Sequence, residues 1–133
     1  MIVTFDTNVL LSSTLWAGSV AQKLLFKLIR ADVRICVSEG IIAEYQKILR
    51  RDFGYSDDEV SYITGKVLSF VVLVHPLKKV CIVKDDPDDD KIIECAIESL
   101  SGYILTYDKH LLSIKEFQGI KIIRPEDAMK FFK

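Results

Sequence analysis

The sequence begins with a decisive stretch, IVTFD at residues 2–6, in which β-branched and aromatic residues run up to an aspartate. Such a run predicts a buried strand over residues 2–5. Asp6 then stands at the C-terminal end of that strand, the edge of a parallel sheet at which ligands bind. Taken by itself, Asp6 could equally be the N-cap or turn residue of Asp-Thr-Asn. Its role therefore depends on what the rest of the chain brings to the same edge.

Beyond this strand, short apolar runs alternate with stretches of helical periodicity. Further strands are predicted over residues 33–37, 70–74, 103–106 and 120–123, with a short extended piece at 80–83. Helices are predicted over residues 20–30, 39–51 and 56–69, from near Asp88 to Gly102, over 109–114, and from Pro125 onward. Apolar strands separated by helices favour an α/β fold in which a parallel sheet is covered by helices on both faces.

The composition is that of a folded domain. The chain has 133 residues, 50% hydrophobic and 28% charged, which suits a single domain over residues 1–133. No apolar run approaches the roughly 20 residues of a membrane helix, and the N-terminus does not resemble a signal peptide. A cytoplasmic protein with no membrane partner is expected. The net charge of −1 argues against a broad basic surface, but a carboxylate site that binds nucleic acid through metal ions stays compatible with it.

The cysteines indicate neither a zinc site nor a disulfide framework. Cys36, Cys81 and Cys95 are an odd number and form no Cys-x-x-Cys pair. Each lies in an apolar run, so buried, reduced thiols are expected.

A second aspartate follows another predicted strand. Asp108 comes two residues after the run 103–106 ends. Because the C-terminal ends of parallel strands share one edge of a sheet, Asp108 is expected on the same edge as Asp6. Asp108 could also serve as the N-cap of the helix predicted over residues 109–114.

The acidic run DDPDDD at residues 85–90 precedes an amphipathic helix. The helix dipole favours acidic residues in a first turn by about 0.3–1 kcal/mol each, but so many carboxylates this close also repel one another. Asp89 lies three and four residues before Ile92 and Ile93, on the stripe that faces the core, whereas Asp90 lies at its edge. An inward-facing carboxylate needs a partner, and a cation is the expected one. Asp89 is the preferred candidate, and Asp90 stays open as the alternative.

Glu44 lies on the flank of the helix predicted over residues 39–51, one turn from Ile41 and Ile48. Alone it indicates little, and its interest comes from the three aspartates. Carboxylates drawn together raise one another's pKa values unless a cation neutralises them. Oxygen ligands without a His or Cys cluster select Mg²⁺ or Mn²⁺. Such ions support hydrolysis of phosphodiesters, because they bind a phosphate and lower the pKa of a bound water.

The chain resembles the PIN-domain family, especially its small prokaryotic members that are toxin components of toxin–antitoxin pairs. The resemblance is carried by IVTFDTNVLLSS at 2–13, DPDDDKIIECAI at 86–97 and GYILTYDKHLL at 102–112. The segment VSEGIIAEYQKIL at 37–49 suits the family's helix with a glutamate. Many members have Asn at the position of Asp90 and Gly at that of Tyr107. These segments occur in order over nearly the full chain.

The resemblance implies a three-layer PIN-like fold with a parallel sheet of about five strands. It also implies a Mg²⁺- or Mn²⁺-dependent endoribonuclease that cleaves single-stranded RNA, often as a homodimer, and a role as the toxin that pairs with a cognate antitoxin. The acidic tetrad carried over is Asp6, Glu44, Asp89 and Asp108, and the polar positions beside it are Thr7, Asn8 and Thr106. Lys91 and Lys109 lie next to the acids in the sequence and are expected to contact RNA.

Two other functions compete with this one. A haloacid-dehalogenase-like phosphatase also has an aspartate after its first strand, but it needs a second aspartate two residues later, where this chain has Asn8. The stronger rival is a catalytically inactive PIN fold that binds RNA or protein. All four acids are present, which counts against it, and stabilisation by Mn²⁺ would separate the two.

Overall fold

The computed structural model describes residues 1–80 and 89–132, whose strands form a six-stranded sheet of order β3-β2-β1-β4-β6-β5. The strands are β1 (Ile2–Phe5), β2 (Arg34–Ser38), β3 (Val72–Val74), β4 (Tyr103–Leu105), β5 (Glu116–Phe117) and β6 (Ile120–Ile123). Neighbouring strands are parallel, except that β5 runs antiparallel to β6. In the central pair, Phe5 lies opposite Leu105, so β1 and β4 end at the same edge.

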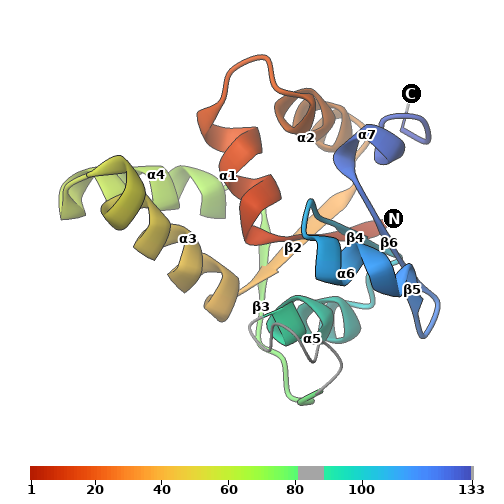
Figure 1. Cartoon of the computed structure of the whole chain (residues 1–133). Helices are drawn as coiled ribbons and strands as arrows, with labels where there is room; N and C mark the ends of the chain where they lie inside the picture. The colour runs from red at the N-terminus through yellow and green to blue at the C-terminus, as the bar shows by residue number, and fades with distance from the viewer. Residues whose placement is uncertain (81–88, 133) are drawn as a thin grey trace.

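Helices cover both faces of this sheet, as predicted. They are α1 (Thr7–Leu15), α2 (Val20–Arg30), α3 (Glu39–Phe53), α4 (Asp57–Leu68), α5 (Asp90–Ser99), α6 (Lys109–Ile114) and α7 (Pro125–Ala128). Figure 1 shows α1, α2 and α7 on one side of the sheet and α5 on the other, and α5 packs against β1 and β2. The core between these layers includes the fully buried Phe5, Tyr45 and Ile93.

The strand order changes direction at β1. From β1 the chain builds β2 and then β3 on one side, and it returns to place β4 on the other side of β1. In an open α/β sheet, a crevice forms at such a switch point, outside the C-terminal ends of the two strands. Asp6 follows β1 and Asp108 follows β4, so the topology brings both to this point.

Several local signals in the sequence are confirmed. Ser38 caps α3, because its side chain accepts a hydrogen bond from the main chain of Ile41. Ser56 and Glu59 form the expected capping box at the start of α4. Gly54 ends α3 in the left-handed conformation, with φ of 66°.

Three features differ from the sequence-based expectations. Helix α1 was not predicted, because it is buried on several sides and lacks the single apolar stripe that marks an amphipathic helix. Strand β5 adds an antiparallel edge to the sheet. Helix α5 ends at Ser99, and the residue that caps it is Leu100, in the left-handed conformation with φ of 59°, rather than Gly102.

Some expectations concern segments that the structure does not describe. The extended piece at 80–83 and the acidic run at 85–88 fall largely within residues 81–88, which lie outside the described residues, as does Cys81. Cys36 and Cys95 are buried free thiols, as expected. Among the described helices, none alone is long and apolar enough to cross a membrane. Helices α1 and α2 pass that test only together, and they are bent by 91° at their junction.

Candidate active site

Asp6 lies just beyond β1 and is nearly enclosed, with only 4% of its surface exposed. Its main-chain N–H donates to the carbonyl of Leu105 at 3.0 Å, which extends the β1–β4 ladder by one bond. Although Asp6 occupies the N-cap position of α1, its side chain makes no capping hydrogen bond. The carboxylate is therefore held in place by the sheet and serves some purpose other than capping.

The pKa of Asp6 is raised to about 6, because burial penalises its charged form. Hydrogen bonds from the Thr106 side chain and the Thr7 main chain oppose this effect, while the charges of Glu44 and Asp108 add to it. The carboxyl groups of Glu44 and Asp108 are thus close enough to Asp6 to act on its ionisation. A positive charge placed among them would relieve their repulsion.

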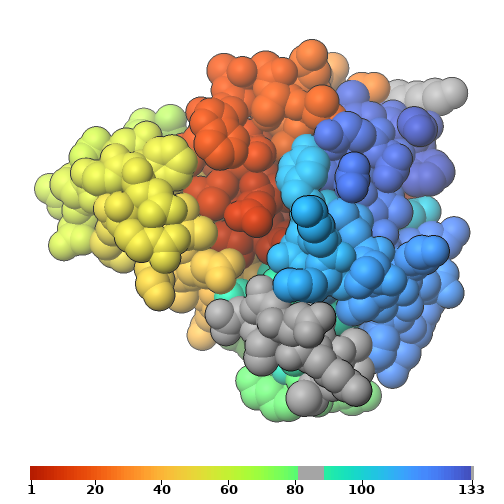
Figure 2. All heavy atoms as spheres, in the orientation of Figure 1, coloured from red at the N-terminus to blue at the C-terminus, as the bar shows by residue number. Residues whose placement is uncertain are grey.

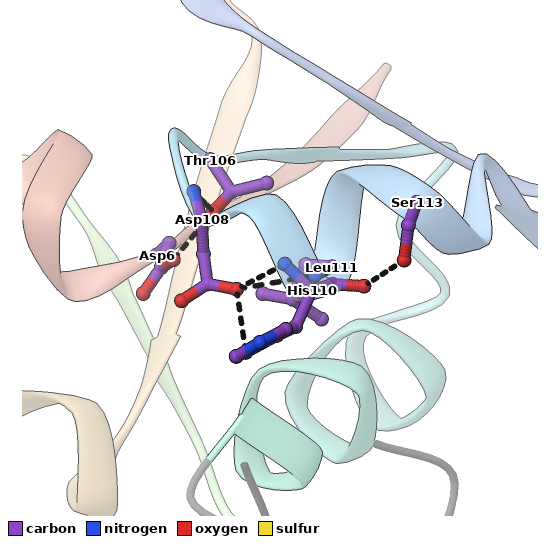
Figure 3. Close-up of polar contacts among 6 residues, drawn as sticks. All are labelled: Asp6, Thr106, Asp108, His110, Leu111 and Ser113. Atoms are coloured by element: carbon purple, nitrogen blue, oxygen red, sulfur yellow. Dashed lines mark hydrogen bonds and ion pairs between the residues drawn. The ribbon is translucent and has the colours of Figure 1, made fainter. Parts of the chain in front are cut away.

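A single hydroxyl joins Asp6 to Asp108. Thr106 Oγ1 donates to Oδ2 of Asp6 at 2.5 Å and accepts the main-chain N–H of Asp108 at 2.9 Å (Figure 3). Thr106 is fully buried, and its own N–H donates to the carbonyl of Ile123 on β6. The position of the Thr106 hydroxyl is therefore set by the sheet. Its two hydrogen bonds fix the Asp6 carboxylate relative to the main chain of Asp108.

Asp108 acts as the N-cap of α6 through one of its two oxygens. Oδ1 accepts the main-chain N–H groups of His110 at 2.8 Å and Leu111 at 3.2 Å. The capping interpretation is thus correct for Oδ1. In the described part of the chain, no hydrogen bond reaches Oδ2, which leaves this oxygen for a further ligand.

Asp89 and His110 gather around Asp108. One donor atom from each of these three residues lies within 4.8 Å of the other two. Asp89 is 8% exposed and occupies the N-cap position of α5 without a capping hydrogen bond from its side chain. Asp90 is the first residue of α5 and is also buried, but the group around Asp108 is formed with Asp89. This geometry favours Asp89 of the two neighbouring acids.

Glu44 approaches the group from α3 and is paired with Lys91 of α5. Lys91 Nζ donates to Oε2 of Glu44 at 2.8 Å, and the two side chains are 25% and 34% exposed. Burial acts to raise the pKa of Glu44, but the hydrogen bond from Lys91, the nearby Thr7 hydroxyl and the charge of Lys47 outweigh it and lower the pKa. Glu44 is therefore ionised beside a cation that the chain itself provides.

The donors fit a divalent cation. Asp89, Asp108 and His110 supply carboxylate oxygens and an imidazole nitrogen at ligand spacing, and Asp6 lies one hydroxyl away from Asp108. Asp6 directly follows β1, Asp89 directly precedes α5, Asp108 lies between β4 and α6, and His110 is in the first turn of α6. Figure 2 shows the molecule in the orientation of Figure 1. In this view the red surface of α1 is flanked by gold and yellow α3 on one side and by blue α6 on the other.

The sequence matches the PIN domain family over residues 2–110. The chain belongs to this family. A comparison with curated proteins gave no match. The fold of this chain is also similar to that of solved structures with low sequence identity. Two of them superpose on it with a TM-score of 0.66. VapBC2 from Rickettsia felis, solved with a DNA fragment from its promoter, is 15% identical, with 92% of this chain and 97% of that chain covered. VapBC-1 from nontypeable Haemophilus influenzae is 16% identical, with 95% and 99% covered.

A third similar structure is a protein from Pyrobaculum aerophilum, with a TM-score of 0.58 and 19% identity over 99% of this chain and 89% of that chain. All three likenesses establish the PIN fold over nearly the whole of each chain.

Of the remaining residues that the sequence nominated beside the acids, Asn8 and Lys109 lie at the surface and Thr7 is buried. Asn8 and Lys109 are exposed in the first turns of α1 and α6, and neither makes a side-chain hydrogen bond to the acids in the described part of the chain. Thr7 is 1% exposed and lies near Glu44. Sequence reasoning missed His110, because no local pattern in the sequence shows where a residue in the first turn of α6 lies relative to the acids.

Proposed function

We propose that this PIN domain is a metal-dependent endoribonuclease that hydrolyses phosphodiester bonds of single-stranded RNA. The observation that carries the proposal is the group of acids at the β1–β4 switch point, where Asp89 lies beside Asp108, and where Asp108 and an ionised Glu44 both act on the charge of Asp6. PIN domains are generally nucleases, and the sequence has an acid at each of the four positions that the resemblance implies, Asp6, Glu44, Asp89 and Asp108. The proposed cofactor is Mg²⁺ or Mn²⁺, because oxygen donors dominate the site.

Hydrolysis of a phosphodiester needs charge stabilisation and an activated water. A divalent cation supplies both when bound, since it neutralises charge on the phosphate and lowers the pKa of a water. The chain contributes the arrangement of its ligands. Thr106 aims the Asp6 carboxylate, and the main-chain N–H groups of α6 fix Oδ1 of Asp108 so that Oδ2 faces the site. Such fixed ligands need little reorganisation when the ion and the RNA arrive.

The rim supplies groups suited to an RNA backbone. Lys109 and Asn8 are exposed beside the acids and can donate to phosphate or sugar oxygens. Lys91 is committed to Glu44, so its contact with RNA requires that pair to open. Such a modest set of basic groups is consistent with binding in which the bound cation provides much of the attraction for phosphate.

The decisive experiment is cleavage of a mixed single-stranded RNA pool by the purified protein, with Mn²⁺, with Mg²⁺ and with a chelator. Cleavage is expected only with a divalent ion, and Asp6→Asn is expected to abolish it. A protein that gains thermal stability with Mn²⁺ but leaves the RNA intact under every condition would support an inactive binding module instead.

We further propose that the protein is a cytoplasmic toxin, a homodimer that a cognate antitoxin covers and inhibits. Two similar structures are VapBC proteins, and the chain exposes large apolar side chains that include Trp16, Phe26 and Tyr62. Exposed apolar surface of this kind marks contacts with other chains. Co-expression with the product of the neighbouring reading frame should yield a complex that does not cut RNA. If the two proteins purify separately and the nuclease still cuts RNA in the presence of the other, the pairing is refuted.

A further inference from the structure

The chain has two histidines, and only one of them lies at the acid group. His110 Nδ1 is 3.9 Å from Oδ1 of Asp108, and Figure 3 shows the ring beside that carboxylate. His75 lies elsewhere, where its Nδ1 is 2.7 Å from a carboxylate oxygen of Glu39. The two imidazoles therefore have different surroundings, which makes His75 a natural control for His110.

The position of His110 is set by the main chain. Its N–H donates to Oδ1 of Asp108 in the α6 cap, so the ring leaves the helix from a fixed point. The ring itself makes no hydrogen bond in the described part of the chain, and the side chain is 47% exposed. It can therefore rotate toward a ligand without breaking a hydrogen bond, and a substitution that removes the ring leaves the main-chain hydrogen bond of the cap in place.

The spacing suits direct coordination. Donor atoms of Asp89, Asp108 and His110 lie within 4.8 Å of one another. Two ligands that each bind one ion at roughly 2.0–2.2 Å are at most about 4.4 Å apart. The donor atoms are thus near the separation that shared coordination needs, and the 47% exposed His110 ring has room to adjust toward an ion.

An imidazole changes which ion the site selects. Mg²⁺ is a hard cation that takes oxygen ligands and keeps much of its water, so it gains little from a nitrogen. Divalent transition ions accept imidazole, and for a given site their affinity rises from Mn²⁺ to Co²⁺. A site of carboxylates alone would separate these ions much less than a site with a nitrogen donor.

We propose that His110 supplies a nitrogen ligand to the cation of this site, together with Asp89 and Asp108, and that it makes the site select Mn²⁺ over Mg²⁺. The inference rests on the metal site of the proposed function and names a ligand outside the expected acidic tetrad. It replaces the expectation that the site offers only oxygen donors, because the fold brings a histidine to the acids.

The first test measures melting temperature against the concentration of each ion, in the absence of RNA. In the wild-type protein, the ion concentration at half of the maximal stabilisation is expected to be at least tenfold lower for Mn²⁺ than for Mg²⁺, and lower again for Co²⁺. In His110→Ala, the Mn²⁺ and Mg²⁺ values should come within about threefold, with the Mg²⁺ value nearly unchanged. An unaltered ratio in His110→Ala, or an equal loss for both ions, would overturn the assignment.

The second test identifies the ligand atom. Pulsed electron paramagnetic resonance of bound Mn²⁺ should show modulation from a directly coordinated ¹⁴N nucleus in the wild-type protein and in His75→Ala. The modulation should vanish in His110→Ala. Its absence from the wild-type spectrum, or its persistence without His110, would show that the nitrogen is not a ligand.

These outcomes are separate from those of the nuclease proposal. A protein that shows the Mn²⁺ preference and the nitrogen signal but never cuts RNA retains the ligand assignment and loses the proposed activity. A protein that cuts RNA equally well with Mg²⁺ and Mn²⁺, and binds both alike with or without His110, retains the activity and loses the ligand assignment. Asp89→Asn serves as the reference that weakens the binding of every ion.

Discussion

Asp6 and Asp108 each follow a strand and precede a helix, and in the sequence both could be ordinary helix caps. In the structure they differ. Asp108 caps α6 with one oxygen, whereas the Asp6 side chain makes no capping hydrogen bond to α1 of that kind and is held chiefly by the hydroxyl of Thr106. Asp6 is thus a buried carboxylate that does not act as the cap of the helix that follows it. Among the acids of the site, it is the one whose replacement separates function from folding most cleanly.

Asp6→Asn is expected to abolish metal-dependent cleavage and to stabilise the metal-free protein at pH 7. The pKa of Asp6 is raised from its ordinary 3.8 to about 6 in the folded chain, so the folded state holds the proton more tightly than the unfolded state. Stability is therefore lost as the pH rises from about 4 to about 6 and is not regained above that range. Asn does not titrate, and the variant should gain about 1–3 kcal/mol at pH 7 but little at pH 4.

Urea unfolding of both proteins between pH 4 and pH 7, with a chelator present, measures this difference. Asp58→Asn, in the exposed first turn of α4, is the matched control and should change neither pH dependence nor cleavage. Equal stability of wild type and Asp6→Asn across the whole range would mean that Asp6 carries no unfavourable charge.

The residue-scale chemistry was only partly readable from the sequence. Asp6, Asp89 and Asp108 were recognisable because strand ends and helical faces can be counted along the chain. His110 was not, because its value depends on the angle at which α6 leaves the Asp108 cap. Likewise, the pairing of Lys91 with Glu44 joins two helices whose relative placement no local pattern encodes.

Between elements, the Lys91–Glu44 pair connects α5 to α3 and supplies the acid group with a cation when no metal is bound. Lys91→Met should destabilise the metal-free protein by about 1 kcal/mol, a modest amount because both side chains are partly exposed. The rise in melting temperature with saturating Mn²⁺ should then be larger than in the wild-type protein, since the ion takes over the neutralisation of Glu44. Lys91→Arg keeps the charge and should behave like the wild type. If the melting temperature of Lys91→Met rises less with Mn²⁺ than that of the wild-type protein, the ion does not replace Lys91 in neutralising Glu44.

The end of α5 offers a second test at this scale. Leu100 has a left-handed backbone with φ of 59° and is 82% exposed, so it bears the strain of that conformation and gains little from burial. Leu100→Gly should stabilise the protein by about 0.5–1 kcal/mol. Leu68→Gly, at the last residue of α4, has no such strain to relieve and should destabilise it. Thermal melts measure the change in stability of each variant. If Leu100→Gly and Leu68→Gly change the melting temperature in the same direction, backbone strain at Leu100 is not the explanation.

Elements were predicted best where they have one polar and one apolar side. Helices α2, α3 and α4 show such a stripe, and their caps and bounds were close to those observed. Helix α1 follows β1 directly and buries Val9, Leu10 and Leu11 together, so no periodic stripe marks it. Strand β5 has two residues, too few for any alternation to appear.

At the scale of the whole molecule, the parallel sheet with two helical layers was predictable, because apolar strands and amphipathic helices alternate.

The sequence did not show which exposed apolar side chains would gather at one place on the surface. Phe26, at 47% exposure, borders a groove between α2 and α4 of about 340 Å³, to which Tyr62 and Phe70 also contribute. Apolar groups gathered in this way favour a contact with another chain.

Light scattering of the purified chain at micromolar concentrations is expected to show a dimer. Phe26→Lys should lower the dimer fraction, because it places a charge in the apolar groove. Leu77→Lys is the control: Leu77 is 85% exposed in a loop, and its replacement should leave association unchanged. A monomer at every accessible concentration would contradict the dimer, and an equal effect of both variants would place the contact elsewhere.

The hydrogen bond from Thr106 to Asp6 spans 100 positions of the sequence, and this separation bears on when activity can arise. A growing chain that has not yet reached Asp108 lacks one of the acids and the hydroxyl that orients another. Contacts of such long range also form late in folding, because the intervening chain must first be ordered. The proposed ribonuclease would be made on a ribosome whose own RNA lies within reach. A site that is completed only when β4 joins β1 would leave the unfinished chain unable to cut that RNA.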